Sequence, residues 1–114
     1  MSKAARKQLI RAYKERARVA GVFAVRCAPT QQTWVESTPD IAGRQNGLWF
    51  TLKLGSHPNK ALQTAWNAEG ERAFRYEELE RFAVDDLSDY ELATRLKDRG
   101  KLWREALGAQ RLTG

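Results

Sequence analysis

Two short apolar segments joined by a polar turn constrain the fold of this chain most strongly. GVFAVRC occupies residues 21–27, and TWVES occupies residues 33–37 after the turn APTQQ. In the first segment successive side chains fall on opposite faces, which is typical of a β-strand. One face holds Val22, Ala24 and the aliphatic part of Arg26, and the other holds Phe23, Val25 and Cys27. We therefore predict an antiparallel β-hairpin.

Two segments with helical spacing follow the hairpin. The first, residues 40–54, opens at Asp40, and its apolar side chains can share one face of a helix. The second, residues 55–70, has clearer boundaries, because Ser56 can cap a helix and Pro58 is tolerated in its first turn. The apolar residues expected to face the core are Ile41, Leu48, Trp49, Leu52, Leu62, Ala65 and Trp66.

The rest of the chain predicts one more strand and one more helix. AFRYEELERF, residues 73–82, alternates as a strand does, and Ser88 with Glu91 forms a capping box that starts a last helix. The inward-facing residues of that helix are predicted to be Leu92, Leu96, Trp103, Ala106 and Leu107. The element order predicts a small α/β (α+β) fold, in which helices flank a three-stranded, mostly antiparallel sheet.

Positive charge is concentrated at the start of the chain. Of the net charge of +6, all lies in residues 1–18, where helical spacing predicts a basic arm preceding a globular domain of residues 19–114. Such an arm can attract the phosphates of nucleic acid, it can dock on an acidic protein, or it can be a solvated helix face. The arm residues predicted to contact nucleic acid are Lys3, Arg6, Lys7, Arg11, Lys14 and Arg18.

Composition excludes several classes of protein. The 114 residues suffice for a single domain, and they include no apolar run of the roughly 18 residues that a membrane span needs. The single cysteine, Cys27, cannot form an internal disulfide and has no second cysteine for a zinc site. We expect a cytoplasmic protein without a membrane partner, while its oligomeric state stays open.

The hairpin and the helix after it resemble the GIY-YIG endonuclease superfamily. Gly21-Val22-Phe23 and Trp34-Val35-Glu36 stand where the family has Gly-Ile-Tyr and Tyr-Ile-Gly, and Ser37 follows. Arg44 occupies the place of the family's catalytic arginine, and LGSHPNKALQTAWNAEGERAF, residues 54–74, is similar to a block in short bacterial members. The resemblance covers residues 21–82 well and the last helix loosely, and it implies a GIY-YIG-like fold.

The resemblance also implies metal-dependent cleavage of a phosphodiester. An arginine in that chemistry offsets charge on the transition state, so Arg44 is expected to clamp phosphate, unless it only pairs with Asp40 one turn earlier. His57 is the only histidine, and it can act as an acid or base, bind the leaving phosphate, or merely close the start of its helix. Asn67 is a further candidate contact to phosphate.

Other parts of the family's chemistry are replaced. Phe23 and Trp34 stand at the two signature tyrosine positions, and neither side chain can accept a proton. Pairing Trp103 with the aromatic that follows the family's metal glutamate puts Gly100 in the place of that glutamate. The remaining weak candidates for holding Mg²⁺ or Mn²⁺ are Glu36, Asp98 and Glu105.

Two functional hypotheses follow from these features. One is a nuclease-like protein that acts on nucleic acid, with DNA as the expected partner and with cleavage weakened or lost. The alternative is a non-catalytic module on the same fold, which binds nucleic acid or an acidic protein and needs no cofactor. Whether the protein is an enzyme stays open, because the tyrosines and the metal carboxylate act as a unit.

Overall fold

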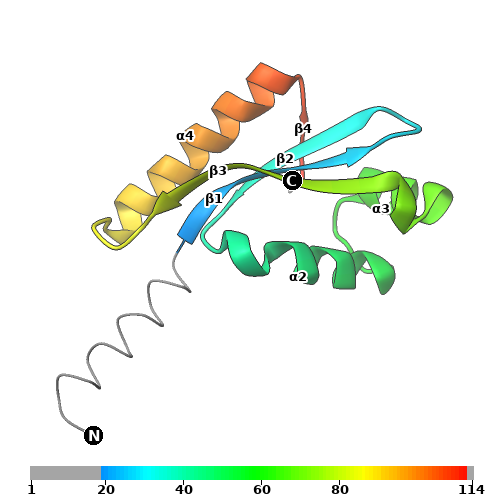
Figure 1. The fold of residues 1–114 in the computed structure, drawn as a ribbon, viewed down its shortest axis with the longest axis horizontal. Coiled ribbons are helices and arrows are strands. Elements are labelled where there is room, and N and C mark those ends of the chain that lie inside the picture. The colour runs from blue at the N-terminus through cyan, green and yellow to red at the C-terminus, as the bar shows by residue number, and fades with distance from the viewer. Residues whose placement is uncertain (1–18, 113–114) are drawn as a thin grey trace, which may run out of the picture.

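The computed structural model describes residues 19–112, so the predicted arm of residues 1–18 and its basic side chains lie outside the described residues. Within that range the chain forms four strands, three α-helices and a short 3₁₀ turn (Figure 1). In chain order these are β1 (Val19–Cys27), β2 (Gln32–Thr38), α2 (Ile41–Lys53), α3 (Lys60–Glu69), η1 (Glu71–Ala73), β3 (Phe74–Ala83), α4 (Asp89–Leu107) and β4 (Gln110–Arg111).

The sheet has one more strand than the sequence predicted. Its order is β3-β1-β2-β4, and β1 pairs antiparallel with both of its neighbours, so the predicted hairpin is confirmed. The correction is β4, which pairs parallel with β2 and makes the sheet mixed. After α4, Gly108 adopts a left-handed conformation (φ 60°) and the chain returns to the open edge of β2. Because β4 consists of only two polar residues, it shows no hydrophobic periodicity from which the strand could be predicted.

The helices lie in two layers, one on each face of the sheet. Helix α4 covers one face, and α2 with α3 covers the other (Figure 1). The predicted alternation of β1 is confirmed, since Phe23 and Val25 join the core under α2 and α3. Val22 and Ala24 join the smaller cluster under α4. Any site built on Phe23 therefore faces α2 and α3.

A bulge in β3 explains the first glycine of the signature. The register of β3 against β1 passes from Glu78 opposite Phe23 to Glu80 opposite Val22, which leaves Leu79 without a partner. The bulge brings the two backbones close, and a Cβ on Gly21 would collide with the backbone carbonyl oxygen of Glu80. Only a residue without a side chain fits that approach.

Helix α4 begins as predicted, but fewer of its residues face the sheet than predicted. The Ser88 hydroxyl accepts a hydrogen bond of 3.1 Å from the Glu91 backbone N–H, which confirms the cap. Leu92, Leu96 and Trp103 are partly buried as predicted, and Gly100 is fully buried between them. The prediction is wrong for Ala106 and Leu107, which are exposed. The helix leans away from the sheet toward its C-terminal end, so its last turn covers no strand (Figure 1).

Helix α3 starts later than the sequence predicted. Its N-cap is Asn59, whose side-chain oxygen accepts a hydrogen bond of 3.1 Å from the Leu62 backbone N–H. Ser56 does not cap this helix, and Pro58 precedes it rather than entering its first turn. The difference arises because the His57 imidazole Nδ1 accepts the Asn59 backbone N–H at 3.0 Å and so holds the cap residue in place. The core-facing residues Leu62, Ala65 and Trp66 are buried as predicted.

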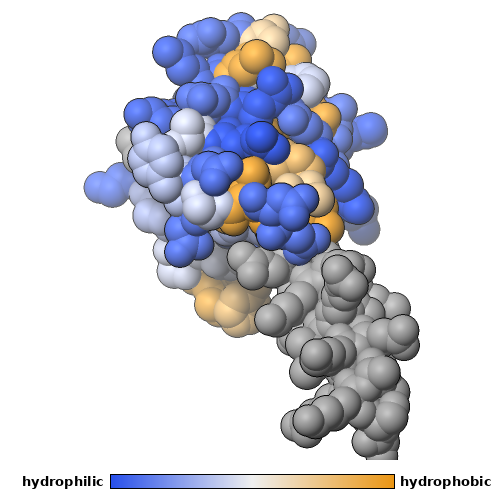
Figure 2. All heavy atoms as spheres, turned by 90° about the vertical axis from the view of Figure 1, so that its left-hand side faces the viewer, coloured by the Kyte–Doolittle hydropathy of each residue, from blue (hydrophilic) through white to orange (hydrophobic). Residues whose placement is uncertain are grey.

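The surface is polar over most of the end that carries the β3–α4 connection, with hydrophobic side chains scattered among hydrophilic ones (Figure 2). Along residues 19–112 no helix has the length and apolar character needed to cross a membrane. Cys27 is buried with a free thiol, as its place on the inward face of β1 requires.

Candidate functional site

Arg44 lies in the first turn of α2 and projects onto the sheet. Asp40 caps this helix by accepting a hydrogen bond of 3.4 Å from the Gly43 backbone N–H. The Arg44 guanidinium lies over the Phe23 ring, 5.7 Å from its centroid, and Arg44 is half-buried. Among residues 19–112 no carboxylate, Asp40 included, is within ion-pair distance of it. A half-buried cation in contact with an aromatic ring and without a carboxylate is receptive to an anion.

His57 lies within electrostatic range of Arg44 and is held as a neutral donor. Its Nδ1 accepts the Asn59 backbone N–H, so in the neutral ring the proton is on Nε2. Burial, and then the positive charge of Arg44, lower the pKa of His57 below its usual value of 6.5. The ring is therefore neutral at physiological pH, and Nε2–H finds no acceptor in the described part of the chain.

Gln63 fixes the backbone of His57 from inside α3. Its side-chain oxygen accepts the His57 backbone N–H at 3.1 Å, and its amide nitrogen donates to the Leu52 carbonyl at 3.0 Å. The same nitrogen donates to the side-chain oxygen of Asn67 at 3.0 Å, which leaves the Asn67 NH₂ group on the exposed side of α3. Gln63 is buried and polar, and these contacts explain how its burial is tolerated.

Tyr76, on β3, is a residue of this site that the sequence analysis missed. Its ring stacks on Phe23, with centroids 5.0 Å apart and an interplanar angle of 19°. Its hydroxyl is buried without a hydrogen-bond partner in the described residues. Burial, then the charge of Glu78, raises the pKa of Tyr76 to about 12. Tyr76 lies diagonally across from Phe23 on the neighbouring strand. An aromatic residue in β3 could have indicated this contact, but the sequence did not show that β3 lies beside β1.

Trp34 does not reach the surface. It is fully buried and packs near Phe74, and its indole N–H has no partner in the described range. The structure thus brings Arg44, Phe23 and His57 together on the α2–α3 face and leaves Trp34 in the core beneath.

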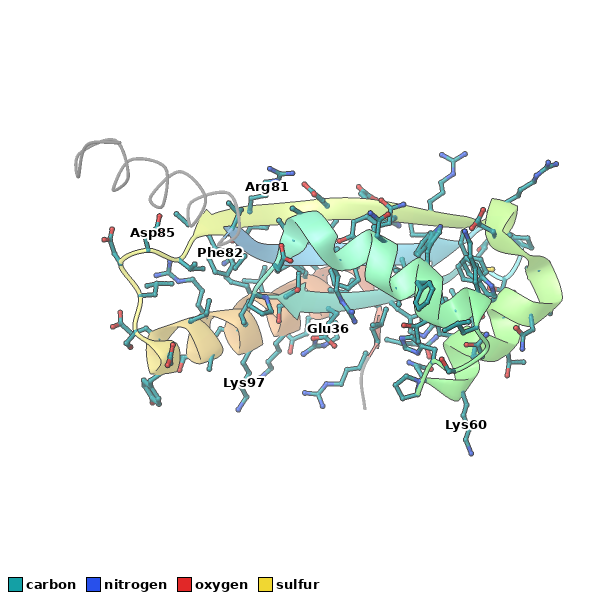
Figure 3. All side chains as sticks on the ribbon, turned by 90° about the horizontal axis from the view of Figure 1, so that it is seen from below. Glu36, Lys60, Arg81, Phe82, Asp85 and Lys97 are labelled. Carbon is teal, nitrogen blue, oxygen red and sulfur yellow. The ribbon has the colours of Figure 1, made fainter. Side chains whose placement is uncertain are left out.

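The candidate metal ligands are not brought together. Asp98 and Glu105 are exposed on α4, on the opposite side of the sheet from Arg44. Glu36 pairs in register with Phe23, yet its side chain lines a hollow with basic residues of α4 and β4 (Figure 3). No group of three or more His, Cys, Asp or Glu side chains within residues 19–112 could hold a metal ion. Within residues 19–112 the candidate carboxylates therefore do not converge on one metal position.

Comparisons with known proteins agree with the fold. No family model matches the chain, and no curated protein matches it significantly. Among solved structures, a mutant of the catalytic domain of intron endonuclease I-TevI matches with a TM-score of 0.65 and 20% identity, over 79% of this chain and 84% of that one. The catalytic domain of homing endonuclease I-TevI matches with a TM-score of 0.64 and 19% identity, over 78% and 88%. The chain has a GIY-YIG-like fold.

Proposed function

We propose that this protein binds nucleic acid, with DNA as the first candidate, by holding a backbone phosphate between Arg44 and His57. The observation that carries the proposal is the Arg44 guanidinium, which is half-buried over Phe23 and unpaired with any carboxylate of residues 19–112. A charge in that position gains most from an anion that comes from outside the protein. The fold shared with a nuclease catalytic domain supports a phosphodiester as that anion.

Arg44, His57 and the basic arm would contribute to phosphate binding in different ways. The planar guanidinium of Arg44 can contact two phosphate oxygens at once. His57 adds a neutral donor, Nε2–H, whose position is fixed by the contacts of its Nδ1 and backbone with Asn59 and Gln63. The basic arm of residues 1–18 adds attraction that is independent of sequence. None of these contacts reads a base edge, so we expect affinity without strong sequence preference.

We further propose that cleavage is weak or absent. Phe23 has no hydroxyl, Trp34 can only donate, and His57 already uses Nδ1 as an acceptor while Nε2 carries the proton. Tyr76 does not ionise near neutral pH, because its pKa is about 12. None of these four side chains is thus a ready base for water. If the protein does cleave, we expect the reaction to need Mg²⁺ or Mn²⁺, as the fold suggests.

The test compares wild-type protein, Arg44→Gln and the control Arg81→Gln. Arg81 is an exposed arginine already paired with Glu78 at 2.6 Å, so its loss should not change binding. Fluorescence anisotropy with labelled single-stranded DNA, duplex DNA and RNA at several salt concentrations gives affinity and salt dependence. We expect Arg44→Gln to weaken binding about tenfold, by roughly 1.4 kcal/mol, and to lower the salt slope by about one unit or slightly less.

The same proteins are incubated with supercoiled plasmid in Mg²⁺, Mn²⁺ or EDTA. We expect intact plasmid in every lane. Nicking by the wild type that EDTA and Arg44→Gln abolish would show that a metal site exists and would refute the proposal that cleavage is weak or absent. Binding to an acidic protein with no affinity for any nucleic acid would refute the proposed function as a whole.

A further inference from the structure

A cluster of basic side chains lies at the edge of β2, beside α4. A hollow of about 250 Å³ is lined by residues from three elements. We call it the basic pocket, and its lining residues are Glu36, Ser37, Leu96, Lys97, Arg104 and Arg111. Three of the six are cations and one is a carboxylate. Figure 3 shows Glu36 and Lys97 near one another at this edge.

Each basic side chain reaches the pocket for a structural reason. Lys97 and Arg104 are two turns apart on α4 and so project from the same side of the helix. Arg111 follows the return of the chain and pairs with Val35 on β2. Asn59 fixes this return, because its side-chain nitrogen donates to the carbonyls of Arg111 and Leu112 at 3.1 and 2.8 Å.

Gly100 opens the space between these cations. It lies between Lys97 and Arg104 on α4 and is buried against Ser37 of β2. A Cβ there would be 3.2 Å from the Arg104 Nη1 and 3.3 Å from the Ser37 Oγ. The Arg104 guanidinium and the Ser37 hydroxyl therefore face the same small volume, which a side chain at position 100 would fill.

The positive charges of the pocket outnumber the carboxylates that the described residues place beside them. Arg26, Lys53, Arg81 and Arg99 each pair with a glutamate, whereas Lys97, Arg104 and Arg111 have no carboxylate within ion-pair distance among residues 19–112. Glu36 is the single carboxylate of the lining, and its Oε1 accepts the Ser37 backbone N–H at 3.2 Å. Three cations beside one carboxylate disfavour a metal cation and favour a phosphate.

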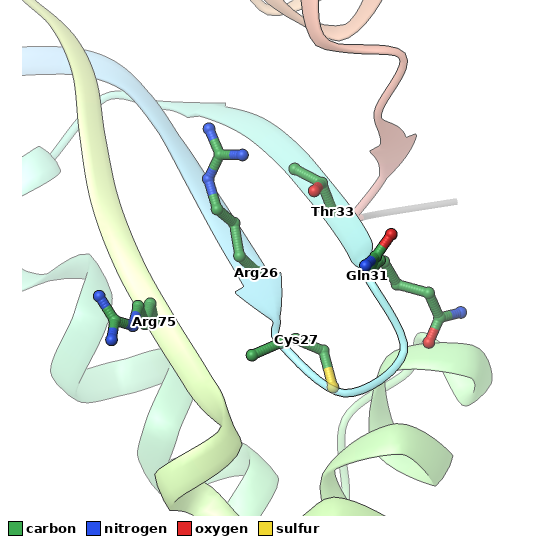
Figure 4. Close-up of a pocket in the computed structure, with 7 residues that line it drawn as sticks. Arg26, Cys27, Gln31, Thr33 and Arg75 are labelled. Carbon is green, nitrogen blue, oxygen red and sulfur yellow. The ribbon is translucent and has the colours of Figure 1, made fainter.

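The hollow at the end of the β1–β2 hairpin has less unbalanced positive charge than the basic pocket. It is lined by Arg26 and Arg75 together with Cys27, Gln31 and Thr33 (Figure 4). Arg26 donates to the Glu77 carboxylate at 3.0 Å, which neutralises one of its two cations. That hollow therefore has a weaker attraction for anions than the basic pocket.

We propose that the basic pocket binds a second backbone phosphate of the nucleic-acid strand held by Arg44. This inference rests on the proposed function. The two sites are neighbours, because Arg44 lies over Phe23 and the pocket begins at Glu36, the register partner of Phe23 on β2. Paired residues of an antiparallel ladder have Cα atoms about 5 Å apart. The pocket reaches both faces at the edge of β2, because Glu36 lies on the face of Phe23 and Ser37 lies on the face of α4. A strand that crosses this edge can place one phosphate beside Arg44 and another in the pocket.

The test measures binding of a labelled 12-nucleotide single-stranded DNA against salt concentration. The variants are Arg104→Gln and Lys97→Gln, and the matched control is Lys101→Gln, an exposed lysine of the same helix that does not line the pocket. We expect the double pocket variant to bind about tenfold more weakly, and its salt slope to fall by roughly 0.7 units for each phosphate that it no longer neutralises. The control should bind like the wild type.

Gly100→Ala tests the pocket without removing a charge. The added methyl would lie 3.2 Å from the Arg104 Nη1, so this guanidinium, the movable end of a flexible side chain, must shift by a few tenths of an ångström. We expect folding to be retained while the methyl narrows the pocket and lowers DNA affinity. A titration with inorganic phosphate, followed by the amide NMR signals of Ser37 and Gly100, locates the anion independently. Shifts at these amides in the wild type that disappear in Arg104→Gln support the proposal.

The outcomes separate this inference from the proposed function. If Arg44→Gln weakens DNA binding and the pocket variants bind like the control, the pocket is not a phosphate site and the proposed function stands. If inorganic phosphate binds in the pocket but the pocket variants keep full DNA affinity, the ligand is a free phosphate, and the inference is overturned. If the wild-type protein binds no nucleic acid, both proposals fail.

Discussion

The rings of Phe23 and Tyr76 lie stacked 5.0 Å apart, and the only hydroxyl of the pair is buried without a partner among the described residues. Phe23 stands where the resemblance expects a tyrosine, so the neighbouring strand supplies the hydroxyl that this position lacks. It does so in a form unsuited to act as a base, since burial and Glu78 raise the pKa of Tyr76 to about 12. The two stacked rings therefore have a structural role, because the Arg44 guanidinium lies over the Phe23 ring.

Tyr76→Phe is expected to stabilise the protein. A buried hydroxyl without a hydrogen bond loses its contacts with water and gains nothing in return, so its removal should raise the free energy of unfolding by about 1 kcal/mol. Urea unfolding of the two proteins measures the difference. A loss of stability of similar size would mean that a water molecule or the arm of residues 1–18 satisfies the hydroxyl.

His57 should make stability depend on pH between 5 and 7. Burial and Arg44 lower its pKa in the folded state below 6.5, so the unfolded chain binds more protons in this range. The contribution of His57 to stability is complete above pH 6.5 and is lost as the pH falls through the folded-state pKa. Urea unfolding at pH 7.5, 6.5, 5.5 and 5.0 checks this.

The comparison for that experiment is His57→Asn, whose side-chain oxygen can still accept the Asn59 backbone N–H. Because His57 is the only histidine, the variant should show a flatter dependence over the same range. Equal slopes in the two proteins would contradict the lowered pKa of His57.

Glu80 should make the β3–α4 contact sensitive to acid. Its carboxylate accepts hydrogen bonds from Arg99 at 2.8 and 3.0 Å and from the Trp103 indole at 2.8 Å. The Arg99 hydrogen bond, and then that of Trp103, lower the pKa of Glu80 below 4.5. Its contribution is therefore present above pH 4.5 and is lost as the pH falls through the lowered pKa.

We expect Glu80→Gln to cost roughly 1 kcal/mol of unfolding free energy at pH 6, a value reduced by the partial exposure of the group. The gap between variant and wild type should close toward pH 2. Glu105→Gln, an exposed residue of α4, is the control and should change stability little at either pH. A gap that persists at pH 2 would indicate a packing defect instead.

Gly21→Ala is expected to destabilise the sheet. The new methyl group would meet the Glu80 backbone carbonyl, which cannot move without breaking the bulge, and overpacking of this kind costs about 1–3 kcal/mol. Gly47→Ala is the matched control, because nothing but its chain neighbours and the nearby backbone of α2 itself lies within 4 Å of its Cβ position in the middle of that helix. That variant should be more stable, by up to about 1 kcal/mol. Thermal unfolding distinguishes the two, and equal stabilities would contradict the predicted collision.

The sequence by itself determined most of the local elements and most of their inward faces. The alternation of Phe23 with Val22 fixed β1 and its two faces, and Ser88 with Glu91 fixed the start of α4. Such signals are local, because side-chain periodicity and helix caps involve residues that are close together in the chain. The spacing of the signature, Arg44 and the block of residues 54–74 were together enough to predict the GIY-YIG-like fold.

Tertiary structure alone decided which distant residues meet. It placed Tyr76 on Phe23 and added β4 to the open edge of β2. It also gathered Lys97, Arg104 and Arg111 around the space left by Gly100. These contacts join elements that are far apart in the chain, and their geometry follows from strand order and from how the helices pack on the sheet. No local pattern of residues carries that information.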